Sequence, residues 1–262
     1  MSLATIQYYQ AQVLRLLPST IPTSLKVALV AWLAINFQTF PGRWHVTVLV
    51  PWLNWMARAR LGLSTPTTSD PDPRTFKFTR TLFSGPGLAD AFGFHLSNSS
   101  YAWAADHVRG PHIYSLLPVP LSLKNVYFAL GSTAFKFTKQ IDIGATFDVT
   151  QELVAYDKKW MYYITSFTTK SQKGGPLILH ATSLSKVVLK CGRRTIVPAR
   201  AIALAGFGEH GAANKVVVNR MTPKQRLAWL IGEDEKSGMS IKVGDMETGM
   251  EGKSEWPGAV SA

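Results

Sequence analysis

The pattern of hydrophobic and polar positions is typical of strands over the middle of the chain, residues 74–206. Apolar and polar side chains alternate there in three long runs, which are Ala145–Tyr156, Trp160–Thr169 and Leu177–Leu189. Short turn-like sequences separate these runs, for example Asp157-Lys158-Lys159, and such short connections join antiparallel neighbours. This part of the chain therefore predicts an antiparallel meander.

One helix interrupts this alternation before the long strands. It begins after Ser97, a residue type that caps helix starts, and it continues to Arg109. Gly110-Pro111 follows directly, and we expect the helix to end there because proline disfavours a continuing helix. A single helix among antiparallel strands indicates an α+β protein in which a curved sheet wraps around a central helix.

The first 63 residues form an apolar leader that we expect to be helical. An uncharged run, Val27–Ile35, is bracketed by Pro22 and Pro41, so it falls just short of the length of a membrane-spanning helix. A second apolar run, Val46–Leu53, has tryptophans at and just after its end, and arginines follow them. Tryptophan and arginine side chains suit the headgroup region of a membrane. The alternative is a pair of helices that covers the hydrophobic body. The tryptophans and arginines in question are Trp52, Trp55, Arg58 and Arg60.

The other segments flank a single domain. Residues 64–73 contain three prolines and no hydrophobic residue, which indicates a linker. The sequence from Thr222 to Leu230 predicts a short helix with Pro223 in its first turn. From residue 233 to residue 262 the chain is polar and glycine-rich, and we expect a largely disordered tail there. The domain itself is assigned to residues 74–206, and residues 207–262 to the short helix plus the tail.

Charge and composition narrow the classes of partner. The formal net charge is +12, but the basic residues are spread without a cluster, so we expect no nucleic-acid partner. A single cysteine, Cys191, excludes an intrachain disulfide framework, and the six histidines include no pair at ligand spacing on one helix. We therefore expect no metal and no cofactor. A reducing, cytoplasmic location fits this composition, with membrane association if the leader is an anchor.

Polar residues just before and within the predicted helix are the candidates for chemistry. A carboxylate such as Asp90 or Asp106 can activate water or attack an acyl carbon, and backbone amides at a helix start can stabilise an oxyanion. Structural alternatives exist for each. Asp90 could cap a turn, His95 could bond a main-chain carbonyl, and Asp106 could pair with Arg109 three residues further on.

The segment Asp90-Ala91-Phe92-Gly93-Phe94-His95-Leu96-Ser97-Asn98-Ser99-Ser100-Tyr101 resembles the hot-dog fold thioesterase-like proteins, above all those encoded in fungal secondary-metabolite clusters. In that family a carboxylate precedes His-x-[Ser/Asn]-Asn-x-x-Tyr, and a second carboxylate lies five residues after the tyrosine, as Asp106 does here. Further matches lie in Lys186–Lys190 and in Arg193–Pro198, so the resemblance covers residues 74–206.

One spacing departs from the thioesterase-like pattern. Asp90 precedes His95 by five residues, whereas the family usually has four. Five is the spacing of the hot-dog hydratases and dehydratases, whose Asn-Pro pair is replaced here by Phe92-Gly93. The motif from His95 to Tyr101 favours a thioesterase, and the position of Asp90 favours a hydratase. The sequence leaves both chemistries open.

The resemblance implies a hot-dog fold, a homodimer with a site built by both protomers, and release of an acyl or polyketide thioester in natural-product biosynthesis. It implies that Asp90 or Asp106 acts as base or nucleophile, and that His95 and Asn98 orient water or the carbonyl. Coenzyme A or a carrier protein would bring phosphate to basic residues. Alternatives are a dehydratase or cyclase and a non-catalytic acyl-binding protein. The residues expected to contact substrate are Phe94, Ser97, Tyr101, Trp103, Lys190, Arg193 and Arg194.

Overall fold

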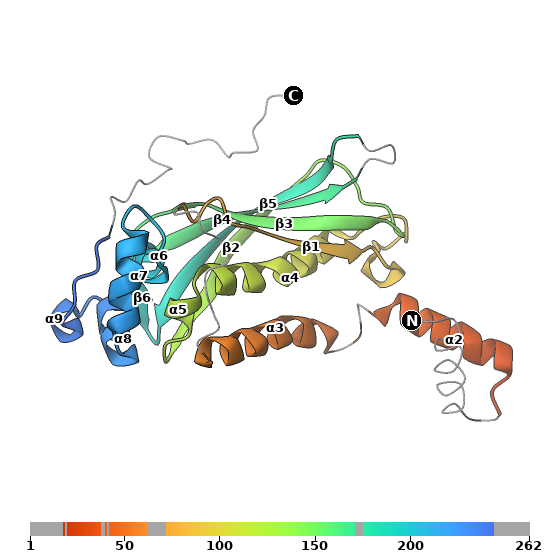
Figure 1. Cartoon of the computed structure of the whole chain (residues 1–262). Helices are drawn as coiled ribbons and strands as arrows, with labels where there is room; N and C mark the ends of the chain where they lie inside the picture. Colours follow the sequence, from red (N-terminus) through yellow and green to blue (C-terminus); the bar gives the residue numbers. More distant parts are fainter. Residues whose placement is uncertain are drawn as a thin grey trace.

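A six-stranded antiparallel sheet curves around one long helix, α4 (Asn98–Leu116), and these two elements position the rest of the protein (Figure 1). The structure is a computed structural model, and it describes residues 18, 20–37, 40, 42–61, 72–170 and 175–243. The strand order is β1-β3-β4-β5-β2, with β6 paired to β5. This arrangement confirms the expected α+β class and the hot-dog fold. The strands are β1 (Lys77–Phe83), β2 (Val126–Phe137), β3 (Thr146–Tyr156), β4 (Trp160–Thr169), β5 (Ile178–Cys191) and β6 (Arg194–Ile196).

The three longest alternating runs of the sequence are the three central strands of the sheet. Alternate side chains of β3 and β4 are buried against the helix side, and the others are half-exposed. The strand β2 lies at an edge and is mostly exposed. A bulge at Gly131 interrupts its pairing with β5, and the Trp160 ring lies so close that a side chain at Gly131 would collide with it.

The central helix is longer than the sequence predicts. Ser97 caps it as expected, by accepting a hydrogen bond from the Ser100 amide. The predicted end at Arg109 is wrong, because the helix passes through Pro111 and continues to Leu116. Gly110 lacks the Cβ that would collide with the following proline ring, and Ile113 and Leu116 are fully buried. The stability gained by burying Ile113 and Leu116 therefore outweighs the loss of the hydrogen bond that Pro111 cannot donate.

The hydrophobic core forms two clusters along α4. One surrounds its first half and includes Tyr101, Ala104 and Val108, and the other surrounds its second half and extends under the C-terminal helices. Those helices, together with the short helix α5 that follows α4, cover one end of the sheet (Figure 1). They are α5 (Pro118–Leu121), α6 (Pro198–Ala205), α7 (Gly211–Arg220), α8 (Pro223–Leu230) and α9 (Asp234–Ser237).

The C-terminal part is more ordered than the sequence predicts over residues 233–243. The predicted helix is α8, where Thr222 and Gln225 form a capping box. Beyond it the chain forms α9 and folds back, because Ile241 is buried and the amide group of Asn214 bonds the main chain of Lys242 in both directions. The predicted tail therefore begins too early, and residues 244–262 lie outside the described part.

The leader contains two helices, α2 (Thr23–Ile35) and α3 (Arg43–Arg60), that are packed differently. Helix α3 lies along α4 on the side away from the sheet, and its Trp55 stacks on Tyr114 at 5.0 Å between ring centroids (Figure 1). Helix α2 has no buried residue. Within the described residues, no helix is long and apolar enough to cross a membrane. Most of the predicted linker, residues 64–71, lies outside the described residues.

Candidate active site

The loop that leads into α4 is built around Asp90. The Asp90 amide donates to the carbonyl of His95 at 2.8 Å, and the Asp90 carboxylate accepts from the amides of Phe94 at 3.0 Å and His95 at 3.4 Å. Gly93, with φ +79°, supplies the left-handed turn that closes the loop. Asp90 thus caps its own loop, as the structural alternative anticipates, and the loop in turn fixes the carboxylate.

The second oxygen of Asp90 faces His95. Asp90 Oδ2 and His95 Nε2 are 3.7 Å apart, and the side chains are 16% and 37% exposed. Burial would raise the pKa of Asp90, but the backbone amides of His95, Phe94 and Phe92, together with the His95 ring, hold it below its usual range. The carboxylate is therefore ionised at neutral pH and reachable by solvent.

His95 has a fixed ring orientation. Its Nδ1 lies 3.1 Å from the carbonyl oxygen of Leu96, which selects the tautomer with the proton on Nδ1 for the neutral ring. The Nε2 atom then faces Asp90. The main chain of this loop is clamped from the other side, because Leu96 N donates to Ile141 O at 2.8 Å. A carboxylate and an imidazole are thus held together on a rigid loop.

The start of α4 adds hydrogen-bond donors to this site. The Ser97 hydroxyl accepts a hydrogen bond from the Ser100 amide at 3.2 Å. Asn98 and Ser99 are the first two helical residues, so their amides have no carbonyl acceptor within the helix. Their amides, with the positive end of the helix dipole, suit a developing oxyanion. The Asn98 side chain is exposed and has no hydrogen bond within the described residues. The start of α4 therefore places Ser97 and Asn98 beside the Asp90 loop.

Aromatic residues near the site divide into two kinds. Phe92 and Phe94 are 79% and 73% exposed on the Asp90 loop, so they offer apolar surface beside the carboxylate. Tyr101, in contrast, is 2% exposed and packs edge-on against Phe137 and Phe167. This burial makes Tyr101 a packing residue of the core, although the sequence analysis expects it to contact substrate. Trp103 faces a different part of the molecule, beside His107 of α4.

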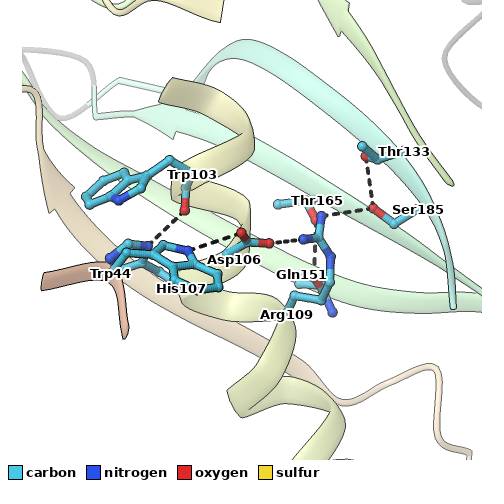
Figure 2. A network of polar contacts seen from close by, with 9 residues as sticks. All are labelled: Trp44, Trp103, Asp106, His107, Arg109, Thr133, Gln151, Thr165 and Ser185. Atoms are coloured by element: carbon cyan, nitrogen blue, oxygen red, sulfur yellow. Dashed lines mark hydrogen bonds and ion pairs between the residues drawn. The ribbon is translucent and has the colours of Figure 1, made fainter. Parts of the chain in front are cut away.

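Asp106 lies about 12 Å along the helix axis from Asn98, given the rise of an α-helix. It forms an ion pair with Arg109, and Trp44 of α3 donates its indole N–H to Asp106 at 3.2 Å (Figure 2). Burial raises the pKa of Asp106, and the opposing effects of Arg109 and Trp44 are smaller. The two candidate carboxylates are therefore separate. Asp106 pairs with Arg109, which is the non-catalytic role that the sequence also allowed for it.

The Asp106–Arg109 pair belongs to a polar layer between α4 and the sheet that the sequence analysis missed. The Arg109 guanidinium donates a hydrogen bond to the Ser185 hydroxyl at 3.3 Å, and the hydroxyls of Ser185 and Thr133 are 3.2 Å apart (Figure 2). A second part of the layer links His112 to Gln151 at 3.2 Å, and Gln151 to Thr165. The available signal was the presence of polar residues at inward positions of β3, β4 and β5. The layer members are His112, Arg109, Gln151, Thr165, Ser183 and Ser185.

Burial in this layer changes the ionisation of its members. The pKa of His112 falls to about 4, because burial disfavours the charged ring and the hydrogen bond to the Phe76 carbonyl only partly offsets this. Burial also lowers the pKa of Arg109. A neutral histidine and a paired arginine are structural roles, so this layer is separate from the Asp90 loop in chemistry as well as in position.

The basic residues expected to contact phosphate lie at the other end of the protomer. Arg193 and Arg194 flank the β5–β6 turn, which adjoins Val126 at the start of β2, whereas Phe137 at the end of β2 contacts the first half of α4. Lys190 donates to Thr195 and Arg194 pairs with Glu233. Within one protomer these residues do not reach the Asp90 loop. Among the residues that the structure describes, no three side chains are grouped to hold a metal ion.

Sequence comparison finds similarity to fungal proteins that are named as thioesterases, and no family model matches the chain. It is 34% identical over 118 residues to a probable thioesterase of Saccharomyces cerevisiae, YBR096W, covering 44% of this chain and 50% of that protein. It is 25% identical over 212 residues to the thioesterase lcsJ of Purpureocillium lilacinum, covering 66% of this chain and 68% of that protein. The chain thus spans half the length of the first relative and about two thirds of the second.

Solved structures resemble the chain over a similar part. A 4-hydroxybenzoyl-CoA thioesterase matches with a TM-score of 0.41 and 11% identity, covering 46% of this chain and 91% of that one. The probable thioesterase YbaW of Escherichia coli matches with a TM-score of 0.39 and 11% identity, covering 49% and 94%. The fold assignment itself rests on the strand order and the central helix. The chain thus has a hot-dog fold, and it is similar in sequence to fungal proteins named as thioesterases.

Proposed function

We propose that the protein hydrolyses an acyl or polyketide thioester, with Asp90 as the group that activates water. The observation that carries this proposal is the ionised Asp90 carboxylate, held by backbone amides next to His95 and beside the amino end of α4. A base, an imidazole and amide donors at a helix start are the groups that acyl transfer requires. The fungal relatives, which are named as thioesterases, support the same reaction class.

The reaction follows from these positions. Asp90 takes a proton from water as the water oxygen bonds to the acyl carbon, and the carbonyl oxygen gains the electron pair of the C=O bond. Amides at the start of α4 stabilise this oxyanion. The C–S bond then breaks as the carbonyl reforms, and the thiolate receives the proton from Asp90 by way of His95. Products are a carboxylic acid and a thiol, and no other reactant is needed.

The substrate is proposed to be a natural-product intermediate on coenzyme A or a carrier protein. The exposed rings of Phe92 and Phe94 supply an apolar surface beside the carboxylate, which suits an acyl or polyketide chain. A dehydratase or cyclase would use the same loop without releasing a thiol. A binding protein would keep its affinity for the acyl group without Asp90.

Thiol release from a panel of acyl-pantetheine and acyl-CoA thioesters tests this proposal. Asp90→Asn should lower turnover at least a hundredfold while the circular dichroism spectrum is unchanged. Asp106→Asn is the matched control, since it makes the same chemical change in the middle of α4 and should retain turnover. Equal losses in the two variants would contradict the role of Asp90. Products lighter by one water, without thiol release, would move the assignment to a dehydratase.

We also propose that two copies pair through β2. This edge strand has no neighbour on its outer side within the described residues, and it exposes Tyr127, Leu130 and Phe137 at 48%, 45% and 44%. Antiparallel pairing of two β2 strands would bring the β5–β6 turn of one copy toward the Asp90 loop of the other. Arg193 could then contact a substrate phosphate. Leu130→Arg should yield a monomer in light scattering with reduced turnover, whereas Leu179→Arg on β5 should not.

Peripheral contact of the leader with a membrane is proposed from its exposed apolar residues. On α3 the side away from α4 carries a stripe of apolar residues that are 47–54% exposed, and α2 exposes Trp32 at 59%. Trp55 does not belong to this surface, because it stacks on Tyr114. Leu49→Ser combined with Leu53→Ser should reduce liposome flotation, and Leu177→Ser on the body should not. Unchanged flotation in the double variant would contradict this contact. The α3 stripe is Val46, Leu49, Val50 and Leu53.

A further inference from the structure

A pocket lies between α3, α4 and the edge strand β1, away from the Asp90 loop. Its volume is about 330 Å³, within the range of small-molecule sites. Three of its lining residues carry a cationic or protonatable group, and each comes from a different element: Arg43 opens α3, Arg80 lies on β1 and His107 lies on α4. None of the lining residues is acidic. They are Arg43, Arg80, Thr81, Leu82, Phe83, Trp103, His107 and Thr146.

Arg80 occupies a position where a hydrophobic residue would be expected. Along β1 the half-buried residues alternate with exposed ones, and Phe78 and Leu82 on either side of Arg80 pack against the hydrophobic cluster around the first half of α4. Within the described residues Arg80 has no ion pair and no hydrogen bond. An unpaired guanidinium on the inner face of a sheet costs stability, so the fold alone does not account for it.

The electrostatic surroundings of this arginine are repulsive. Burial lowers the pKa of Arg80, and the charge of Arg43 lowers it further. Burial likewise lowers the pKa of His107, and Arg80 and Arg43 both add to that effect while its bond to the Trp103 carbonyl opposes it. Asp106 pairs with Arg109 and accepts a hydrogen bond from Trp44, and Asp148 accepts one from the hydroxyl of Thr81, which lines the pocket. Within the described residues neither acid forms an ion pair with Arg43, Arg80 or His107. A bound anion would relieve this repulsion.

Two further features suit an oxyanion ligand. Arg43 is the first residue of α3, so the positive end of that helix dipole lies at the same pocket. The His107 ring is held in place by the 2.9 Å contact of Nδ1 with the Trp103 carbonyl, which directs Nε2 away from the helix (Figure 2). Two guanidinium groups and one imidazole suit a phosphate ligand better than a carboxylate ligand, since phosphate offers more acceptor oxygens.

We propose that the pocket of Arg43, Arg80 and His107 is a binding site for a phosphate group. The ligand class is a phosphate ester, from either an anionic lipid headgroup or a soluble phosphate compound. The site is independent of thioester hydrolysis, because Asp90 and His95 do not line it. Phosphate binding and the loss of turnover in Asp90→Asn are therefore separate results.

Thermal unfolding and calorimetric titration of the full chain with inorganic phosphate test the site. We expect phosphate to raise the melting temperature of the wild type in a saturable manner. Arg80→Gln should melt at the same or a higher temperature without phosphate, because it removes an unpaired inward cation, and it should bind phosphate at least tenfold more weakly. Arg80→Lys should bind with intermediate affinity. Lys124→Gln, which removes an exposed cation elsewhere, should behave as wild type.

The opposite results would overturn the site. If phosphate stabilises Arg80→Gln as much as wild type, or stabilises neither, the pocket does not bind phosphate. A lower melting temperature of Arg80→Gln without phosphate, with unchanged phosphate affinity, would assign Arg80 a structural role. Vesicles of phosphatidylcholine with and without phosphatidic acid identify the source. Retention of wild type but not Arg80→Gln on phosphatidic acid indicates a lipid headgroup, and competition of phosphate binding by coenzyme A indicates a soluble ester.

Discussion

The loop before α4 and the middle of that helix each carry an aspartate, and the two carboxylates differ in what holds them. Backbone amides of its own loop hold Asp90, whereas an arginine and a tryptophan side chain hold Asp106. The pKa of Asp90 is lowered and that of Asp106 is raised. The Asp90 side chain is 16% exposed and that of Asp106 is 33% exposed, so the two differ in their partners and not in access to solvent. Asp90 stays ionised, whereas Asp106 links α3 to α4. The proposed chemistry therefore belongs to the Asp90 loop, and we expect the polar layer to contribute to stability.

The largest effect that separates the two regions is on turnover. Asp90→Asn removes the base, so thiol release should fall at least a hundredfold, with the melting temperature nearly unchanged. Asp106→Asn should retain turnover and lower the melting temperature. Steady-state kinetics and thermal unfolding of the two variants, measured side by side, make the comparison. If Asp106→Asn also abolished turnover in a folded protein, the division between the two regions would be wrong.

The next effect is a pH dependence of stability that belongs to the polar layer. Because His112 has a pKa of about 4 in the folded protein and about 6.5 unfolded, the unfolded chain binds its proton first. Stability is therefore full above pH 6.5 and falls by roughly 3 kcal/mol as pH drops to 4. In His112→Phe, which preserves stacking with Phe76, this slope should flatten in urea unfolding curves. His45→Phe, at an exposed position, should keep the slope.

A smaller effect follows from the ion pair in the same layer. Arg109→Met leaves Asp106 and Ser185 without their shared partner, and should lower the free energy of unfolding by about 2 kcal/mol. The value is moderate because the Asp106 side chain is 33% exposed and water can replace part of the interaction. Substrate KM should not change. A raised KM at unchanged stability would instead connect the polar layer to the Asp90 site.

The smallest expected effect concerns the contact of α3 with the polar layer. Trp44→Phe removes the indole N–H that bonds Asp106 and keeps an aromatic ring, so we expect a loss of about 1 kcal/mol in urea unfolding. Trp32→Phe is the control, because Trp32 lies exposed on α2. Equal losses would mean that the hydrogen bond contributes nothing measurable.

The sequence predicts elements whose signal is local and misses those that depend on distant neighbours. The alternation in β3, β4 and β5 and the Ser97 cap are written in adjacent residues, and all were predicted. The passage of α4 through Pro111 depends on burial of Leu116 by elements far along the chain, so the local stop signal was misleading. Order in residues 233–243 likewise depends on Asn214.

The candidate site was predicted in the same uneven way. Asp90, His95 and Ser97 lie within one loop and its helix start, so their proximity follows from the spacing of the motif. The separation of Asp106 from Asp90 depends on the helical residues between them. The hydrogen bond from Trp44 to Asp106 depends on where α3 packs. The remoteness of Arg193 from the Asp90 loop depends on the path of the strands. None of these three is encoded by residues close in sequence.

The proline in the middle of α4 has a consequence for local opening. Pro111 has no amide hydrogen, so the His107 carbonyl loses its helical partner, and the ladder is interrupted where the two hydrophobic clusters meet. Each half of α4 is thereby fastened mainly to its own cluster. Amide hydrogen exchange should then show two cooperative units of different protection instead of one. The half that bears the Asp90 loop could fluctuate during substrate entry while the C-terminal half keeps the fold intact.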